Sequence, residues 1–245
     1  MITAAITAAV TALITLAAAG CGETEERIRV DLTLKAEGRR GALLTTRGWA
    51  ISLEQAQLHA GPVRFFEGAP LFGQSAPPRR WYQWLAPAVI SSAHAHPGHY
   101  VPGEALGDVL ATTTIDLLAP TPTHLGAGDG VSGRYNSAEI ALSPAADLGA
   151  ACARISGVAT KGGRSISFST AVAGPETIRG IAFGAEVSAA ASVVLTVDLD
   201  AWIARIDFDA LPAGTATVAF PPQTQGYNAF QRGLVSSAAY QFRKE

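Results

Sequence analysis

Residues 27–36 read RIRVDLTLKA, and this stretch carries the clearest information about the fold of the chain. Its apolar residues Ile28, Val30, Leu32 and Leu34 alternate with Arg29, Asp31, Thr33 and Lys35. A period of two residues is typical of a strand that has one face in a core and the other in solvent. The stretch therefore predicts a half-buried β-strand.

Similar stretches, separated by Gly and Pro turns, follow over most of the remaining chain. We expect strands at residues 42–46, 49–54, 63–66, 108–118, 131–142, 151–161, 164–172, 177–187, 193–199 and 215–220. The alternation changes phase after Glu54, which predicts a bulge or a change of strand and leaves His59 on the more exposed face. Many short strands at close spacing predict an all-β domain, an antiparallel β-sandwich, with a closed barrel as the alternative.

Helical patterns are short and lie near the C-terminus. Residues 200–206 fit a single helical turn that packs Trp202. Phe230, Leu234 and Ala238 recur at four-residue spacing, which predicts a short amphipathic helix over 228–237, followed by a strand at 239–242. Residues 120–130, which contain His124 and several glycines, are expected to form a loop.

The N-terminus has the pattern of an export signal. Residues 2–19 are almost wholly apolar, and Ala18-Ala19-Gly20-Cys21 resembles the lipobox of bacterial lipoproteins, although no Lys or Arg precedes the apolar run. We expect a signal peptide at 1–20, a lipidated tether at 21–26 and a single domain at 27–245. Lipid on Cys21 would anchor the domain to a membrane of the cell envelope, in the periplasm or at the outer membrane. An uncleaved transmembrane anchor is the alternative.

Composition and motifs argue against several functional classes. The net charge is -2 and the pI is about 6.2, so nothing indicates nucleic acid binding. No phosphate-binding loop or glycine fingerprint opens a helix, so we expect no nucleotide. No G-x-S-x-G motif is present, and we expect no enzymatic activity. Paired carboxylates of a hydrolase stay open as an alternative because their pairing is spatial.

The sulfur-containing residues restrict the chemistry further. With Cys21 lipidated, Cys152 is the only thiol of the domain and cannot form an internal disulfide. We expect it to be a buried, inert core residue, with a metal thiolate as the alternative. Met1 is the only methionine and is removed with the signal, so a soft Cu(I) site rich in methionine is excluded. Four further candidates, Asp198, Asp200, Asp207 and Asp209, do not match calcium-loop spacing and fit the exposed ends of strands.

Residues 67–102 break the strand pattern with many prolines. Phe72, Trp81, Tyr82 and Trp84 lie among them, and such aromatic side chains need burial. We therefore expect a long ordered loop insertion that folds over one end of the domain.

The insertion ends in a histidine cluster, His94, His96 and His99, with the turn Pro97-Gly98 inside it. Neutral imidazoles with oxygen partners suit Cu(II) or Zn(II), so we expect copper or zinc here. His59 or His124 is expected as a further ligand, brought to the same end of the sandwich from another loop or strand end. The alternative is a plain surface loop, or one whose aromatic residues dock an envelope protein partner.

Three stretches together resemble the methanobactin-associated periplasmic (MbnP-like) family and related uncharacterised bacterial lipoproteins. They are WAISLEQAQLHAGPVRFF at 49–66, the histidine loop that continues into Tyr100-x-x-Gly103-Glu104, and SVVLTVDLDAWIARIDF at 192–208. The resemblance is one of pattern and order over most of residues 27–242. It implies a periplasmic copper-binding β-sandwich, paired in some members with a di-haem peroxidase-like partner that oxidises a tryptophan to kynurenine. No tryptophan of this chain is assigned that role.

Overall fold

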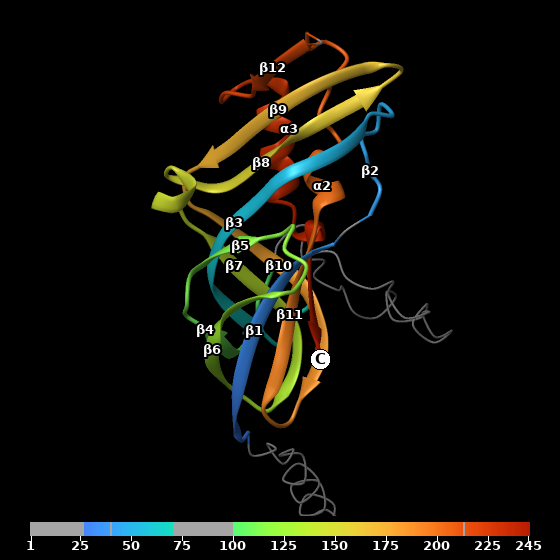
Figure 1. Ribbon diagram of the computed structural model, residues 1–245. Helices are drawn as coiled ribbons and strands as arrows, with labels where there is room; N and C mark the ends of the chain where they lie inside the picture. Colours follow the sequence, from blue (N-terminus) through green and yellow to red (C-terminus); the bar gives the residue numbers. More distant parts are fainter. Residues whose placement is uncertain (1–26, 40, 71–99, 213) are drawn as a thin grey trace, which may run out of the picture.

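The computed structural model describes residues 27–39, 41–70, 100–212 and 214–245, and it confirms a mostly β, sandwich-like fold with a short C-terminal helix (Figure 1). The strands are β1 (Arg29–Arg39), β2 (Leu43–Leu44), β3 (Ala50–Phe66), β4 (Ala105–Val109), β5 (Thr113–Asp116), β6 (Thr123–Val131), β7 (Gly133–Leu142), β8 (Ala151–Lys161), β9 (Arg164–Ala173), β10 (Glu176–Val187), β11 (Ala191–Asp198), β12 (Gly214–Ala219) and β13 (Tyr240–Lys244). The helices are α2 (Leu199–Ile203) and α3 (Gln225–Leu234), with 3-10 turns η3 (Ala146–Leu148) and η4 (Ser237–Ala239).

Strand β1 shows the alternation that the sequence predicts. Val30, Leu32 and Leu34 are buried, while the polar residues between them are exposed or half-buried. Ile28 differs from the expectation, because it precedes the strand and is 54% exposed. The apolar face of β1 therefore begins at Val30.

Eight strands form a closed ring in the order β3, β4, β6, β1, β11, β13, β10 and β7, because β7 also pairs with β3. Most pairings are antiparallel, as expected, but β1–β11, β10–β13 and β9–β12 are parallel. The sheet is therefore mixed, and the two layers of the sandwich join at their edges. Parallel partners are distant in sequence, which is why no turn signal predicts them.

Strand β3 connects this ring to a second, open part of the sheet (Figure 1). Its C-terminal half pairs with β4 and β7, and its N-terminal half pairs with β8 and β2. The register between β3 and β8 shifts between Leu53 and Gln55, so the change of phase is a bulge within one strand. The strands expected at 151–161 and 164–172 pair as the hairpin β8–β9, with Lys161 opposite Arg164 across its two-glycine turn.

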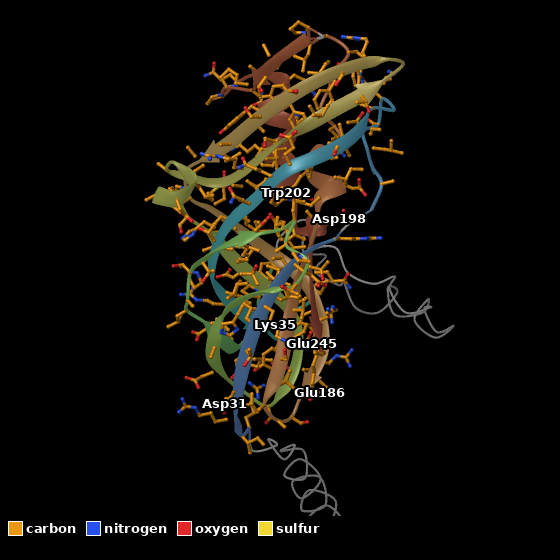
Figure 2. The ribbon with its side chains drawn as sticks, viewed as in Figure 1. Asp31, Lys35, Glu186, Asp198, Trp202 and Glu245 are labelled. Carbon is orange, nitrogen blue, oxygen red and sulfur yellow. The ribbon has the colours of Figure 1, made fainter. Side chains whose placement is uncertain are left out.

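Two groups of aromatic side chains fill the two parts of the molecule. Phe65, Tyr135, Phe183 and Phe242 contact one another inside the ring, and Trp49, Phe168, Phe208 and Phe220 do so under the open part. Between them α2 buries Trp202, whose ring meets Phe230 of α3 edge-on at 5.6 Å (Figure 2). The helices thus close the core between the two sets of strands.

Three sequence expectations about elements are wrong. The strands expected separately at 49–54 and 63–66 are parts of the one long strand β3. Residues 123–131, expected within or next to a loop because of their glycines, form strand β6 instead. Two of the glycines are needed because neighbouring strands lie close: a side chain on Gly128 would overlap the carbonyl oxygen of Asp108 in β4, and one on Gly130 would overlap the hydroxyl of Tyr135 in β7. The single strand expected at 108–118 is divided into β4 and β5.

Candidate functional site

The three clustered histidines His94, His96 and His99 lie outside the described residues, as do Phe72, Trp81, Tyr82 and Trp84. The structure describes the two stems from which this segment leaves the domain. The stems are residues 67–70 and 100–104. The amide of Glu67 donates to the carbonyl of Glu104 at 3.0 Å, and the amide of Gly68 donates to the carbonyl of Pro102 at 2.7 Å. The insertion therefore starts and ends at one place on the ring.

Arg27 holds the two stems together. Its guanidinium lies 3.3 Å from the carboxylate of Glu67 and 2.8 Å from that of Glu104. Glu104, one of the oxygen donors near the histidines in the sequence, is thus engaged by a cation. The pairs are partly exposed, so each contributes modestly to stability.

Tyr100 is the first described residue after the histidines, and it is fixed on the ring. Its hydroxyl lies 2.9 Å from Ser137 Oγ, and its ring meets Phe66 edge-on at 6.5 Å. Because Ser137 donates its proton to the carbonyl of Gly68 at 2.6 Å, Tyr100 must donate to Ser137. Burial raises the pKa of Tyr100, so its oxygen is a protonated donor at neutral pH and a poor metal ligand.

His59 lies within β3 and is half-buried. Its Nδ1 is 2.9 Å from the hydroxyl of Thr114, which stands opposite in the register of β3 and β5. Only Nε2 of this imidazole is left without a partner in the described part of the molecule. A histidine that binds a metal usually does so through one ring nitrogen while a neighbouring group holds the other, and His59 has this arrangement.

His124 is exposed on β6, opposite Lys35 of β1. Next to His124, the hydroxyl of Thr113 in β5 donates a hydrogen bond to the carbonyl of Leu125 at 3.3 Å, and this bond connects β6 to β5. Both described histidines are therefore held on strands. His124 is the second residue of β6, so it comes from the end of a strand and not from the loop expected at 120–130. Strand β5 lies between them.

The stems and His59 lie at different positions along β3, and His124 lies on β6. Tyr100 packs on Phe66, and His59 is about seven residues away along the same strand, roughly 23 Å at the usual rise. A metal site shared by all five histidines would require residues 94–99 to reach back along β3. Within residues 27–39, 41–70, 100–212 and 214–245, no three His, Cys, Asp or Glu side chains are placed to hold a metal ion.

The other candidate ligands have structural roles in the described domain. Cys152 is fully buried, and burial raises the pKa of its thiol to about 11, which suits an inert core residue. Asp198 caps α2 by accepting from the amide of Asp200 at 3.0 Å. Asp209 accepts from Trp49 Nε1 at 2.9 Å.

Sequence reasoning missed a cavity of about 620 Å³ between β7, β10 and the segment from η4 into β13. Its wall contains Arg134, Phe183 and Ser237, which are far apart in sequence. No motif joins these residues. The nearest signal in the sequence is Gly184 within β10, since a glycine inside a strand often marks a bulge.

Comparison of the chain with models of known protein families, with curated proteins and with solved structures finds no match. Among the described residues, no helix combines the length and apolar character that crossing a membrane requires.

Proposed function

We propose that this protein is an exported lipoprotein of the bacterial cell envelope that binds one Cu(II) or Zn(II) ion without catalysing a reaction. The observation that carries the proposal is the spacing of His94, His96 and His99 in a loop broken by Pro97-Gly98. Alternate residues of an extended segment share one face, and the turn allows the third imidazole to fold back towards the first two.

The described geometry supports a site formed mainly by the loop histidines. Tyr100 and Glu104 are engaged by Ser137 and Arg27, so neither oxygen is free to complete the coordination sphere. His59 presents one free nitrogen and His124 is exposed, so either can serve as a fourth ligand. The pattern-level resemblance to the periplasmic copper-binding family agrees with the proposal. A role for the modified tryptophan of that family is not part of it.

Isothermal titration of Zn(II) and Cu(II) into the chain from Gly22 onward tests the proposal. We expect one ion per chain at pH 7.5 and a loss of affinity of more than about 100-fold in the His94→Ala/His96→Ala double variant, since loss of outer partners alone costs roughly 10–100-fold. Affinity should also fall at pH 5.5, because imidazole must be unprotonated to bind and its ordinary pKa is about 6.5.

Single His59→Ala and His124→Ala variants are the matched controls, and they separate the loop histidines from the strand histidines. A fourth ligand on a strand would show as a partial loss of affinity in one of them. If the double variant binds as tightly as the wild type, or if binding does not change with pH, the metal proposal is wrong and docking of a protein partner becomes the better explanation of the insertion.

A further inference from the structure

The cavity between β7, β10 and β13 arises from an irregularity in β10. Ala182 pairs with Ser137 and Ala185 with Tyr135, so β10 has one residue more than β7 over this interval. Gly184, with φ of 67°, absorbs the extra residue in a left-handed conformation. The pairing of β10 with β13 is reduced to one position, Ala182 opposite Gln241. The strands therefore separate here and leave the cavity open between them.

One side of the cavity is polar and carries a positive charge. Arg134 Nε donates to Asn136 Oδ1 at 3.1 Å, and the amide of Asn136 donates to the carbonyl of Glu67 at 2.7 Å. These bonds orient the guanidinium and leave its two terminal nitrogens without a partner among the described residues. Glu186 stands opposite Arg134 in the register, but no carboxylate of the described chain comes within 4.0 Å of the guanidinium.

A second polar group of the wall has no partner. Ser237 is 7% exposed, and its Oγ is buried without a hydrogen-bond partner in the described structure. An unpaired buried hydroxyl costs free energy, roughly 1–3 kcal/mol in proteins.

The remaining wall is apolar. Phe183 is half-buried between the aromatic core of the ring and the cavity, and Ala182, Pro70 and Tyr240 continue the surface. A volume of about 620 Å³ falls in the range of small-molecule sites, about 300–1,000 Å³. The site therefore combines an aromatic and aliphatic wall with one oriented cation.

We propose that this cavity binds a small organic carboxylate whose body is apolar or aromatic. Arg134 would receive the carboxylate through its two free terminal nitrogens, the geometry in which guanidinium groups pair with carboxylates. Phe183 and Tyr240 would contact the body of the ligand. A doubly charged phosphate monoester fits less well, because Arg134 is the one cation among the described residues of the cavity wall and Glu186 lies opposite it.

Equilibrium binding of 2-naphthylacetate and its neutral amide 2-naphthylacetamide to the full chain in lipid nanodiscs tests the proposal, with empty nanodiscs as the blank. We expect the carboxylate to bind more tightly than the amide. Arg134→Gln should weaken binding of the carboxylate by about tenfold or more and leave binding of the amide nearly unchanged, because it removes a charge-assisted pair. Naphthyl phosphate should bind more weakly than the carboxylate.

Two further variants keep the test decisive. Arg205→Gln is the matched control, since Arg205 is exposed, does not line the cavity and has no ion pair in the described structure. Ala238→Trp fills the mouth from an exposed position and should abolish binding of both probes without changing the melting temperature. Equal binding of acid and amide, equal effects of the two arginine variants, stronger binding of the phosphate, or no binding to the folded wild type would each overturn the proposal. These outcomes do not depend on metal binding.

Discussion

Asp209 makes several polar contacts in the open part of the molecule. Its carboxylate accepts from Trp49 Nε1 at 2.9 Å, from Lys161 at 3.2 Å and from Arg47 at 3.2 Å. Arg47 and Trp49 belong to the connection between β2 and β3, and Lys161 is the last residue of β8. Arg164 lies over the Trp49 ring at 5.2 Å and donates to the carbonyl of Leu211 at 2.8 Å. One carboxylate thus joins segments that are far apart in sequence.

These contacts lower the pKa of Asp209 to about 2, with the hydrogen bond from Trp49 as the largest cause. A carboxyl whose pKa is lower in the folded than in the unfolded state stabilises the fold above its unfolded pKa, about 3.9. That stabilisation is lost as the pH falls from about 4 towards 2.

We expect Asp209→Asn to lower the melting temperature by a few degrees at pH 7, because the amide keeps an acceptor for Trp49 but loses its charge towards Lys161 and Arg47. The difference from wild type should shrink as the pH is lowered from 4 to 2, where the wild-type carboxyl takes up its proton. Thermal unfolding followed by circular dichroism at pH 7, 4 and 2 measures this. Asp147→Asn, at an exposed position of η3, is the control and should change little. A wild-type advantage that stays constant down to pH 2 would contradict the assignment.

The sequence expectation for Asp209 was an exposed end of a strand. The residue is exposed, but it lies in a turn between α2 and β12 and not at the end of a strand, and the expectation contains no information about its partners. Trp49 and Lys161 are separated from it by more than 40 positions, and only the fold brings them together. The same limit applies to the cavity, whose Arg134 and Ser237 share no motif.

Among the elements, the strands with local partners were the most predictable. The β8–β9 hairpin follows from two alternating stretches and a Gly-Gly turn, and α2 follows from the residues around Trp202. Strand β6 was not predicted because several glycines are typical of a loop. In the structure, the lack of a side chain at Gly128 allows β4 to lie close to β6. The α3 helix begins at Gln225, three residues before the predicted start, because Thr224 accepts from the amide of Tyr227 and caps it.

Helix α3 meets α2 at Gly233, and this contact has no room for a side chain. A Cβ at Gly233 would overlap the carbonyl oxygen of Ala201 and lie 2.7 Å from the Cα of Trp202. Both neighbours are backbone atoms of α2, so the helices would have to move apart. The separation would also loosen the Trp202–Phe230 contact in the core.

We expect Gly233→Ala to destabilise the protein by about 1–3 kcal/mol, the usual cost of overpacking, even though alanine has the higher helix propensity. Chemical denaturation with urea measures the change. Asn228→Ala, on the exposed face of the same helix, is the control and should stay within about 0.5 kcal/mol of wild type. If Gly233→Ala is as stable as the control, the close approach of the two helices is wrong.

At the scale of the whole molecule, Arg27 connects the N-terminal end of the described chain to the stems of the insertion. The described chain begins at Arg27, below β1 and at the opposite end of the molecule from β12 (Figure 1). The C-terminal end is tied to the same strand, because Glu245 pairs with Lys35 at 2.7 Å and accepts from Ser192 at 2.6 Å (Figure 2). Cys21 precedes Arg27 by about six residues, which span at most about 20 Å. Under the proposed anchoring, the stems of the histidine segment would therefore be held close to the membrane.

We expect Cys21→Ala to release the protein from the membrane without unfolding it. The residue carries the proposed lipid, which supplies the membrane affinity, and it precedes the described domain, in which no bond depends on it. Fractionation of cell envelopes after a carbonate wash measures the release, and thermal unfolding of the released protein measures the fold. Thr24→Ala, in the same tether, is the control and should remain in the membrane fraction. If Cys21→Ala also stays there after the wash, residues 2–19 act as a retained anchor, and the domain would then be held by a peptide rather than by an acyl chain.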